Sequence, residues 1–107
     1  MDGVARGTPR TTVERSPEGA AALVKIVGEL DLATVPGVER ELDPLVQSPA
    51  ERVAFDLSGV SFMDSSGIAM LLRVAGKVLS IEVRDPSVAV QTVIRATGLS
   101  AVLRTGS

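Results

Sequence analysis

The stretch DLSGVSFMDSSG, residues 56–67, joins the end of a predicted strand to the start of a predicted helix. Residues 52–57 read as a strand, and Ser58-Gly59 is typical of a turn. Asp64 or Ser65 is a favoured helix N-cap residue. The predicted helix ends at Gly76, and its apolar residues recur at three- and four-residue spacing: Ile68, Leu71, Leu72 and Ala75.

The same alternation of strand and helix extends toward the N-terminus. Residues 21–27 form an apolar, partly alternating run that ends at Gly28, with Lys25 expected to face outward. Thr34 can cap the next helix, in which Pro44 predicts a kink or an end near 42–43. The residues that share one face of that helix are Val35, Val38, Leu42 and Leu45. Residues 11–14 favour a short edge strand, joined to the next strand by a turn at 16–19.

Toward the C-terminus, residues 79–83 predict a strand and Asp85-Pro86 a helix start with Pro at its first position. That helix ends before Gly98, and Val90, Val93, Ile94 and Thr97 share one of its faces. Residues 101–103 could add a last edge strand. Strands that alternate with helices predict a single α/β domain with a largely parallel sheet and right-handed connections.

Composition narrows the class of protein. A chain of 107 residues fits one domain, and 45% apolar with 22% charged residues is typical of a folded, soluble protein. We expect a flexible tail over residues 1–10 and the domain over 11–107. A net charge of -2 argues against nucleic-acid binding, and the sequence has neither a membrane-spanning run nor a secretory signal. The absence of Cys is compatible with the cytoplasm, where we expect the protein.

Few side chains in the sequence can support catalysis. There is no His and no Cys, which excludes the usual nucleophile pairs and the commonest transition-metal ligands. Phosphate-cradling and dinucleotide-binding motifs are also missing. A hard-metal site formed by Asp31, Asp56 and Asp64 is an alternative with weak ligand spacing. We therefore expect that the protein is not an enzyme and that it binds neither a cofactor nor a metal ion.

Three segments, in this order, resemble the STAS domain of bacterial anti-sigma factor antagonists. They are GELDLAT at 28–34, DLSGVSFMDSSG at 56–67 and DPSVAV at 85–90, and TGL at 97–99 also fits. The resemblance covers residues 11–103 and implies a four- to five-stranded mixed sheet, largely parallel, with helices packed mainly on one face. The segment 67–85 is several residues shorter than is usual in that family.

The resemblance implies a phosphorylation switch at Ser65, the Ser that directly follows Asp64. Its implied partners are an anti-sigma factor serine kinase that uses ATP and a serine phosphatase, with no direct contact to nucleic acid or membrane. The implied partner-binding residues are Asp31, Thr34, Asp64, Ser65, Ser66 and Gly67. Two alternatives stay open: Asp31 and Asp64 only cap their loops, or the chain is a non-switching STAS module in a transport assembly or signalling scaffold.

Overall fold

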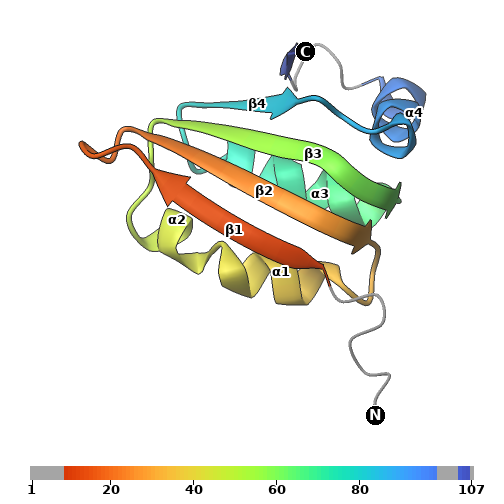
Figure 1. The fold of residues 1–107 in the computed structure, drawn as a ribbon, viewed down its shortest axis with the longest axis horizontal. Helices are drawn as coiled ribbons and strands as arrows, with labels where there is room; N and C mark the ends of the chain where they lie inside the picture. Colours follow the sequence, from red (N-terminus) through yellow and green to blue (C-terminus); the bar gives the residue numbers. More distant parts are fainter. Residues whose placement is uncertain (1–8, 99–103, 107) are drawn as a thin grey trace.

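A five-stranded sheet forms the centre of the computed structural model, which describes residues 9–98 and 104–106 (Figure 1). Its strands, in spatial order, are β1 (Arg10–Arg15), β2 (Ala21–Leu30), β3 (Arg52–Met63), β4 (Ser80–Arg84) and β5 (Arg104–Gly106). β1 is antiparallel to β2, and the other neighbouring strands are parallel. The predicted mixed, largely parallel sheet is therefore confirmed.

The helices connect the parallel strands and lie mainly against one face of the sheet (Figure 1). They are α1 (Val35–Glu41), α2 (Asp43–Gln47), α3 (Ser65–Ala75) and α4 (Val88–Thr97). In the described residues, no helix is long and apolar enough to cross a bilayer. The predicted arrangement of helices is confirmed, because β2 and β3 each direct alternate apolar side chains toward the helices.

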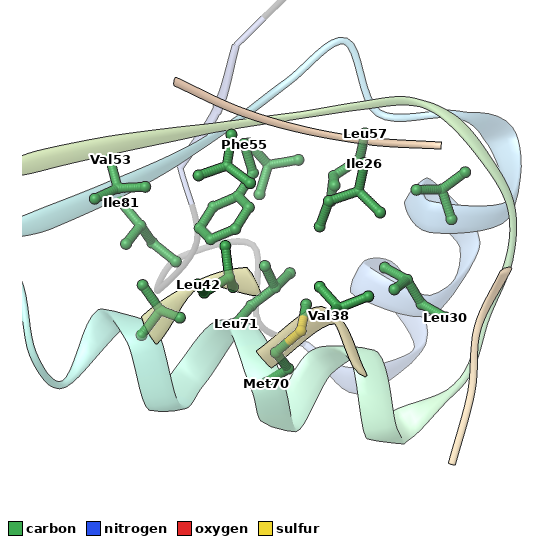
Figure 2. Close-up of a cluster of buried hydrophobic side chains, with 14 of the residues drawn as sticks. Ile26, Leu30, Val38, Leu42, Val53, Phe55, Leu57, Met70, Leu71 and Ile81 are labelled. Carbon is green, nitrogen blue, oxygen red and sulfur yellow. The ribbon is translucent and has the colours of Figure 1, made fainter. Parts of the chain in front are cut away.

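The core fills the space between the sheet and the helices (Figure 2). Phe55 and Leu57 of β3 and Ile26 of β2 face Leu71 and Met70 of α3 across this space. All five of these side chains are fully buried. The opposite face of the sheet carries polar residues, among them the exposed Lys25 that the sequence predicted to face outward. One buried face and one solvated face are typical of a sheet covered by helices on one side only.

The first helical region is split as its proline predicts. α1 ends at Glu41 and α2 begins at Asp43, so that Pro44 lies in the first turn of α2, where a missing backbone donor costs little. The predicted apolar face is confirmed, because Val35, Val38, Leu42 and Leu45 are all buried.

Both long strands run further than the sequence predicted. β2 continues past Gly28, which has φ +128°, to Leu30, and its register against β3 shifts on either side of that residue. The turn predicted at Ser58-Gly59 is wrong, since β3 is continuous to Met63. Ser58 instead donates its N–H and hydroxyl to the Asp56 carboxylate at 3.0 and 2.7 Å, within an irregular stretch of the ladder. Register irregularities of this kind are β-bulges, which bend a strand without ending it.

Two predictions for the later helices need correction. In α3, Leu72 is 37% exposed while Met70 is fully buried, so the apolar face is rotated by part of a turn from the predicted stripe. In α4, the N-cap is Ser87, whose hydroxyl accepts from the Val90 N–H at 3.3 Å, and the predicted start at Asp85-Pro86 is wrong. The predicted stop at Gly98 is confirmed by its φ of +71°. The edge strand predicted at 101–103 falls outside the described residues.

Candidate interaction site

The carboxyl ends of β2 and β3 lie next to each other, and the candidate site is formed by the loops that follow them (Figure 1). Leu30 pairs with Met63 in the sheet, and the Asp64 N–H donates to the Leu30 carbonyl at 3.2 Å. This contact joins the loop before α1 to the loop before α3. The loops that carry Asp31 and Asp64 therefore converge at one end of the sheet.

Asp64 caps α3 and leaves Ser65 at the surface. Asp64 Oδ1 accepts from the Ser66 N–H at 2.8 Å, and its carbonyl accepts from the Gly67 N–H at 3.0 Å. Ser65, the first residue of α3, is exposed, whereas Asp64 and Ser66 are half-buried. Of the two residues that the sequence offered as the cap, Asp64 has this role, so the Ser65 hydroxyl is not committed to capping.

Gly67 lets the first turn of α3 lie directly on the strand ends. It is buried, and a Cβ at this position would lie 2.6 Å from Met63 Cγ and 3.3 Å from Leu30 Cβ. Contacts this short leave no room for a side chain. Gly67 thus lies beneath the site rather than on its surface. The close contact that it allows sets how far Ser65, two residues earlier in the chain, stands out from the strand ends.

The loop between β2 and α1 is held by its own side chains. Asp31 Oδ1 accepts from the N–H groups of Ala33 and Thr34, both at 3.0 Å. The Thr34 hydroxyl donates to the Glu29 carbonyl at 2.8 Å and accepts from the Asp31 N–H at 2.9 Å. Thr34 is the N-cap residue of α1, as the sequence predicted, but its side chain makes no capping bond to the helix. Asp31 and Thr34 instead fix the loop beside Ser65.

The sequence did not single out Leu32, although it is the apolar residue of this loop. Its side chain is 78% exposed. It forms one rim of a groove of about 270 Å³ between α1 and α3, called here the α1–α3 groove. The groove is lined by Leu32, Val35, Pro36, Glu39, Ser66, Ala69 and Arg73. A large aliphatic residue directly after Asp31 was the only signal in the sequence, and it does not predict a groove.

An ion pair joins the two helices at the groove. Arg73 Nε of α3 donates to Glu39 Oε2 of α1 at 2.7 Å. This hydrogen bond raises the pKa of Arg73 above its ordinary value. Because both side chains are substantially exposed, the pair contributes little to stability. It does place a positive and a negative charge together beside the groove.

The alternative of a metal-dependent site has no support in the described residues. Within residues 9–98 and 104–106, no three His, Cys, Asp or Glu side chains are grouped as metal ligands would be. The three carboxylates considered from the sequence do not converge: Asp56 bonds Ser58 within β3, far along the strand from Asp64.

The sequence matches one family and resembles known antagonists. The model of the family described as "Mlab, STAS domain" matches residues 13–105. Two curated relatives, the anti-sigma-B factor antagonists of Staphylococcus epidermidis and Staphylococcus aureus, are 43% and 41% identical to this chain over 49 residues. Those residues are 46% of this chain and 45% of each relative, so the match spans about half the length of these curated relatives.

Solved structures agree with the fold. An anti-sigma factor antagonist from Mycobacterium paratuberculosis superposes with a TM-score of 0.82 at 25% identity, over 92% of this chain and 86% of that one. The anti-sigma factor antagonist SpoIIAA in its unphosphorylated form gives 0.75 at 21% identity, over 92% and 89% of the two chains, and shares the fold. Since the family match covers most of the sequence and the fold agrees with it, the chain belongs to the STAS domain family.

Proposed function

We propose that this chain is a cytoplasmic anti-sigma factor antagonist, switched off by phosphorylation of Ser65. In the unmodified state it binds an anti-sigma factor serine kinase, and the sigma factor is then free to direct transcription. The kinase transfers a phosphoryl group from ATP to Ser65, and a serine phosphatase resets the switch. The observation that carries the proposal is the exposed Ser65 at the start of α3, with Asp64 already serving as the helix cap.

A phosphate on Ser65 would enter a site with little to neutralise it. The Ser66 N–H, which would otherwise favour an anion at the helix start, already donates to Asp64. The phosphate adds about -1.5 to -2 charges at pH 7, next to the Asp64 carboxylate and near the Asp31 loop. A partner surface that tolerates a neutral hydroxyl here would lose its electrostatic and steric fit. The fold need not change, since Ser65 points away from the core.

The second candidate function is a non-switching STAS module, held in a transport assembly or signalling scaffold. The description of the matching family, "Mlab, STAS domain", is the observation that keeps it open, because that description names no sigma factor. Such a module would bind its partner in the same way whether or not Ser65 carried a hydroxyl.

The test is the mass of the intact protein after incubation with ATP and each anti-sigma factor kinase of the source organism. We expect a gain of one phosphate, placed on Ser65 by peptide fragmentation. Ser65→Ala should abolish the gain. Ser66→Ala is the matched control and should keep it, because Asp64 bonds the backbone of Ser66 and not its hydroxyl. No phosphate with any kinase would favour the non-switching module, whereas a phosphate confined to Ser66 or to another hydroxyl would contradict the assignment of the switch to Ser65.

A further inference from the structure

β1 lies at one edge of the sheet, and its outer side is open. Among residues 9–98 and 104–106, β1 pairs with β2 on one side and with no strand on the other (Figure 1). A strand at the edge of a sheet presents a row of backbone N–H and C=O groups to which another strand can bond.

The hydrogen bonds of the hairpin show which backbone groups of β1 point outward. The Ser16 N–H donates to the Ala21 carbonyl at 2.9 Å, and these two residues continue the register of β1 and β2. Hydrogen-bonded pairs alternate along an antiparallel ladder, so every second residue of β1 bonds to β2. The residues whose N–H and C=O groups point away from β2 are the others: Thr11, Val13 and Arg15.

A groove lies next to this open edge, between β1 and α1. It has a volume of about 720 Å³ and is called here the β1–α1 groove. Thr11 and Thr12 line it from β1, and Pro36 and Gly37 line it from α1. The helix therefore packs beneath β1 without covering its outer side, as Figure 1 also shows.

The residues that could block the edge are placed at its two ends. Pro9, which has no N–H to donate, precedes the first residue of β1. The Arg15 guanidinium donates to the carbonyls of Pro44 and Ser48, which directs this side chain toward α2. The middle of the edge thus has none of the features that commonly prevent strands from pairing.

The charges of β1 are complementary to those of the same strand in reverse. Arg10 and Glu14 lie two residues before and two residues after Thr12, and all three side chains are exposed. With a two-fold axis at Thr12, Arg10 of each copy would lie opposite Glu14 of the other. These are non-hydrogen-bonded positions, where opposite side chains are closest and unlike charges stabilise the pairing. An axis at Val13 would place Thr12 opposite Glu14 and form no such pair.

We propose that β1 pairs antiparallel with β1 of a second copy of this chain, with a two-fold axis at Thr12. The two five-stranded sheets then form one continuous sheet, with the helices of both copies on the same face. Thr11 of each copy exchanges two backbone hydrogen bonds with Val13 of the other, and the two β1–α1 grooves are covered together. Ser65 lies in neither the strand nor the groove, so the inference does not depend on the proposed function.

The first measurement is the mass of the full chain in solution by sedimentation equilibrium over a range of protein concentrations. One joined strand is a small interface, so we expect monomer and dimer in exchange, with a dissociation constant on the order of 0.1 mM. Amide hydrogen exchange should show the N–H groups of Thr11 and Val13 becoming protected as the concentration rises. The N–H of Thr12, which bonds to β2, should change little.

Charge reversal tests the pairing and its register. Arg10→Glu places like charges opposite each other twice in the dimer, so it should weaken association at least about fivefold. Combining Arg10→Glu with Glu14→Arg exchanges the two charges and should restore the association of the wild type. Lys77→Glu makes the same change of sign at an exposed residue after α3 and is the matched control, for which no effect is expected.

A backbone variant tests the same pairing without a change of charge. Thr11→Pro removes an N–H that points away from β2, and proline is tolerated at such edge positions. The melting temperature at low protein concentration should stay within a few degrees of that of the wild type. Association should weaken about tenfold, since one hydrogen bond is lost from each copy.

Three results would overturn the inference. The first is a wild-type chain that stays monomeric up to about ten times the expected dissociation constant. The second is a dimer that Arg10→Glu and Thr11→Pro leave unchanged, because the copies would then meet at another surface. The third is a double charge exchange that does not restore association, which would show that Arg10 does not lie opposite Glu14.

Discussion

Gly67 and Gly37 provide a paired test of how closely α3 is packed on the strand ends. Both are the third residue of their helix, α3 and α1. A Cβ at Gly67 would meet Met63 Cγ at 2.6 Å, whereas a Cβ at Gly37 would meet nothing closer than the Arg40 guanidinium at 3.7 Å. The same substitution to Ala should therefore have opposite effects on stability.

The expected magnitudes follow from two opposing effects. Gly to Ala in a helix stabilises by about 0.5–1 kcal/mol, and this is the whole effect expected for Gly37→Ala. At Gly67 the added methyl group must displace Met63, which is only 4% exposed and cannot swing into solvent. Overpacking of this kind costs about 1–3 kcal/mol, so Gly67→Ala should destabilise by about 1–2 kcal/mol net. Gly67→Val should destabilise more, since its branched side chain also loses rotamer freedom in the helix.

Two measurements test this: the free energy of unfolding from urea titration, and the melting temperature monitored by circular dichroism. For a domain of this size, about 1 kcal/mol corresponds to roughly 4–8 °C in melting temperature, so a rise for Gly37→Ala and a fall for Gly67→Ala are both measurable. If Gly67→Ala stabilises the protein as much as Gly37→Ala does, the first turn of α3 is not held against Met63. The account of how Ser65 is presented would then be refuted.

Three further predictions concern other parts of the molecule. Ser65→Ala should fold and bind the kinase constitutively, whereas Ser65→Asp should fold equally well but bind more weakly, most clearly at low salt; equal affinities in calorimetry would contradict a charge switch. Hydrogen bonds from Ser58, first from its hydroxyl and then from its N–H, lower the pKa of Asp56. The ionised carboxylate therefore stabilises the fold at pH values above its ordinary pKa, and this stabilisation is lost as the pH falls toward and below that pKa. Ser58→Ala should raise the pKa of Asp56 in an NMR titration and weaken the acid-dependent loss of stability; an unmoved pKa would be inconsistent with this cause. Arg15 donates to the carbonyl of Pro44, at 2.9 Å, and to that of Ser48, and Arg15→Met should destabilise by about 0.5–1.5 kcal/mol in urea unfolding, while no change would show that these bonds contribute nothing.

Much of the local structure could be predicted from the sequence, because neighbouring residues decide it. Pro44 divides the first helical region and Gly98 ends the last one, as their backbone preferences require. Asp64 caps α3 through a bond to a residue only two positions away. The start of α3 at Asp64 and Ser65 therefore follows from short-range chemistry, and only the choice of Asp64 rather than Ser65 as the cap was left open by the sequence.

The strand ends were predicted less well, because they depend on partners far along the chain. Ser58-Gly59 has the composition of a turn, yet β3 continues through it. Gly59 pairs with Val27 of β2, and a Cβ there would lie 2.9 Å from Val27 Cγ2, so the glycine serves close packing between two strands. A local propensity for turns was outweighed by hydrogen bonding in the ladder, which no short stretch of sequence reveals.

The sequence by itself determined the order of strands and helices, the location of Ser65 at the start of a helix and the absence of the His and Cys residues that common catalytic chemistry uses. Only the tertiary structure decided that Leu32 is exposed beside a groove and that Arg73 meets Glu39, a residue 34 positions away. Capping and propensity act over one helical turn and are visible in neighbouring letters. A groove between two helices exists only once the sheet has brought α1 and α3 together, since its shape is set by packing across the core.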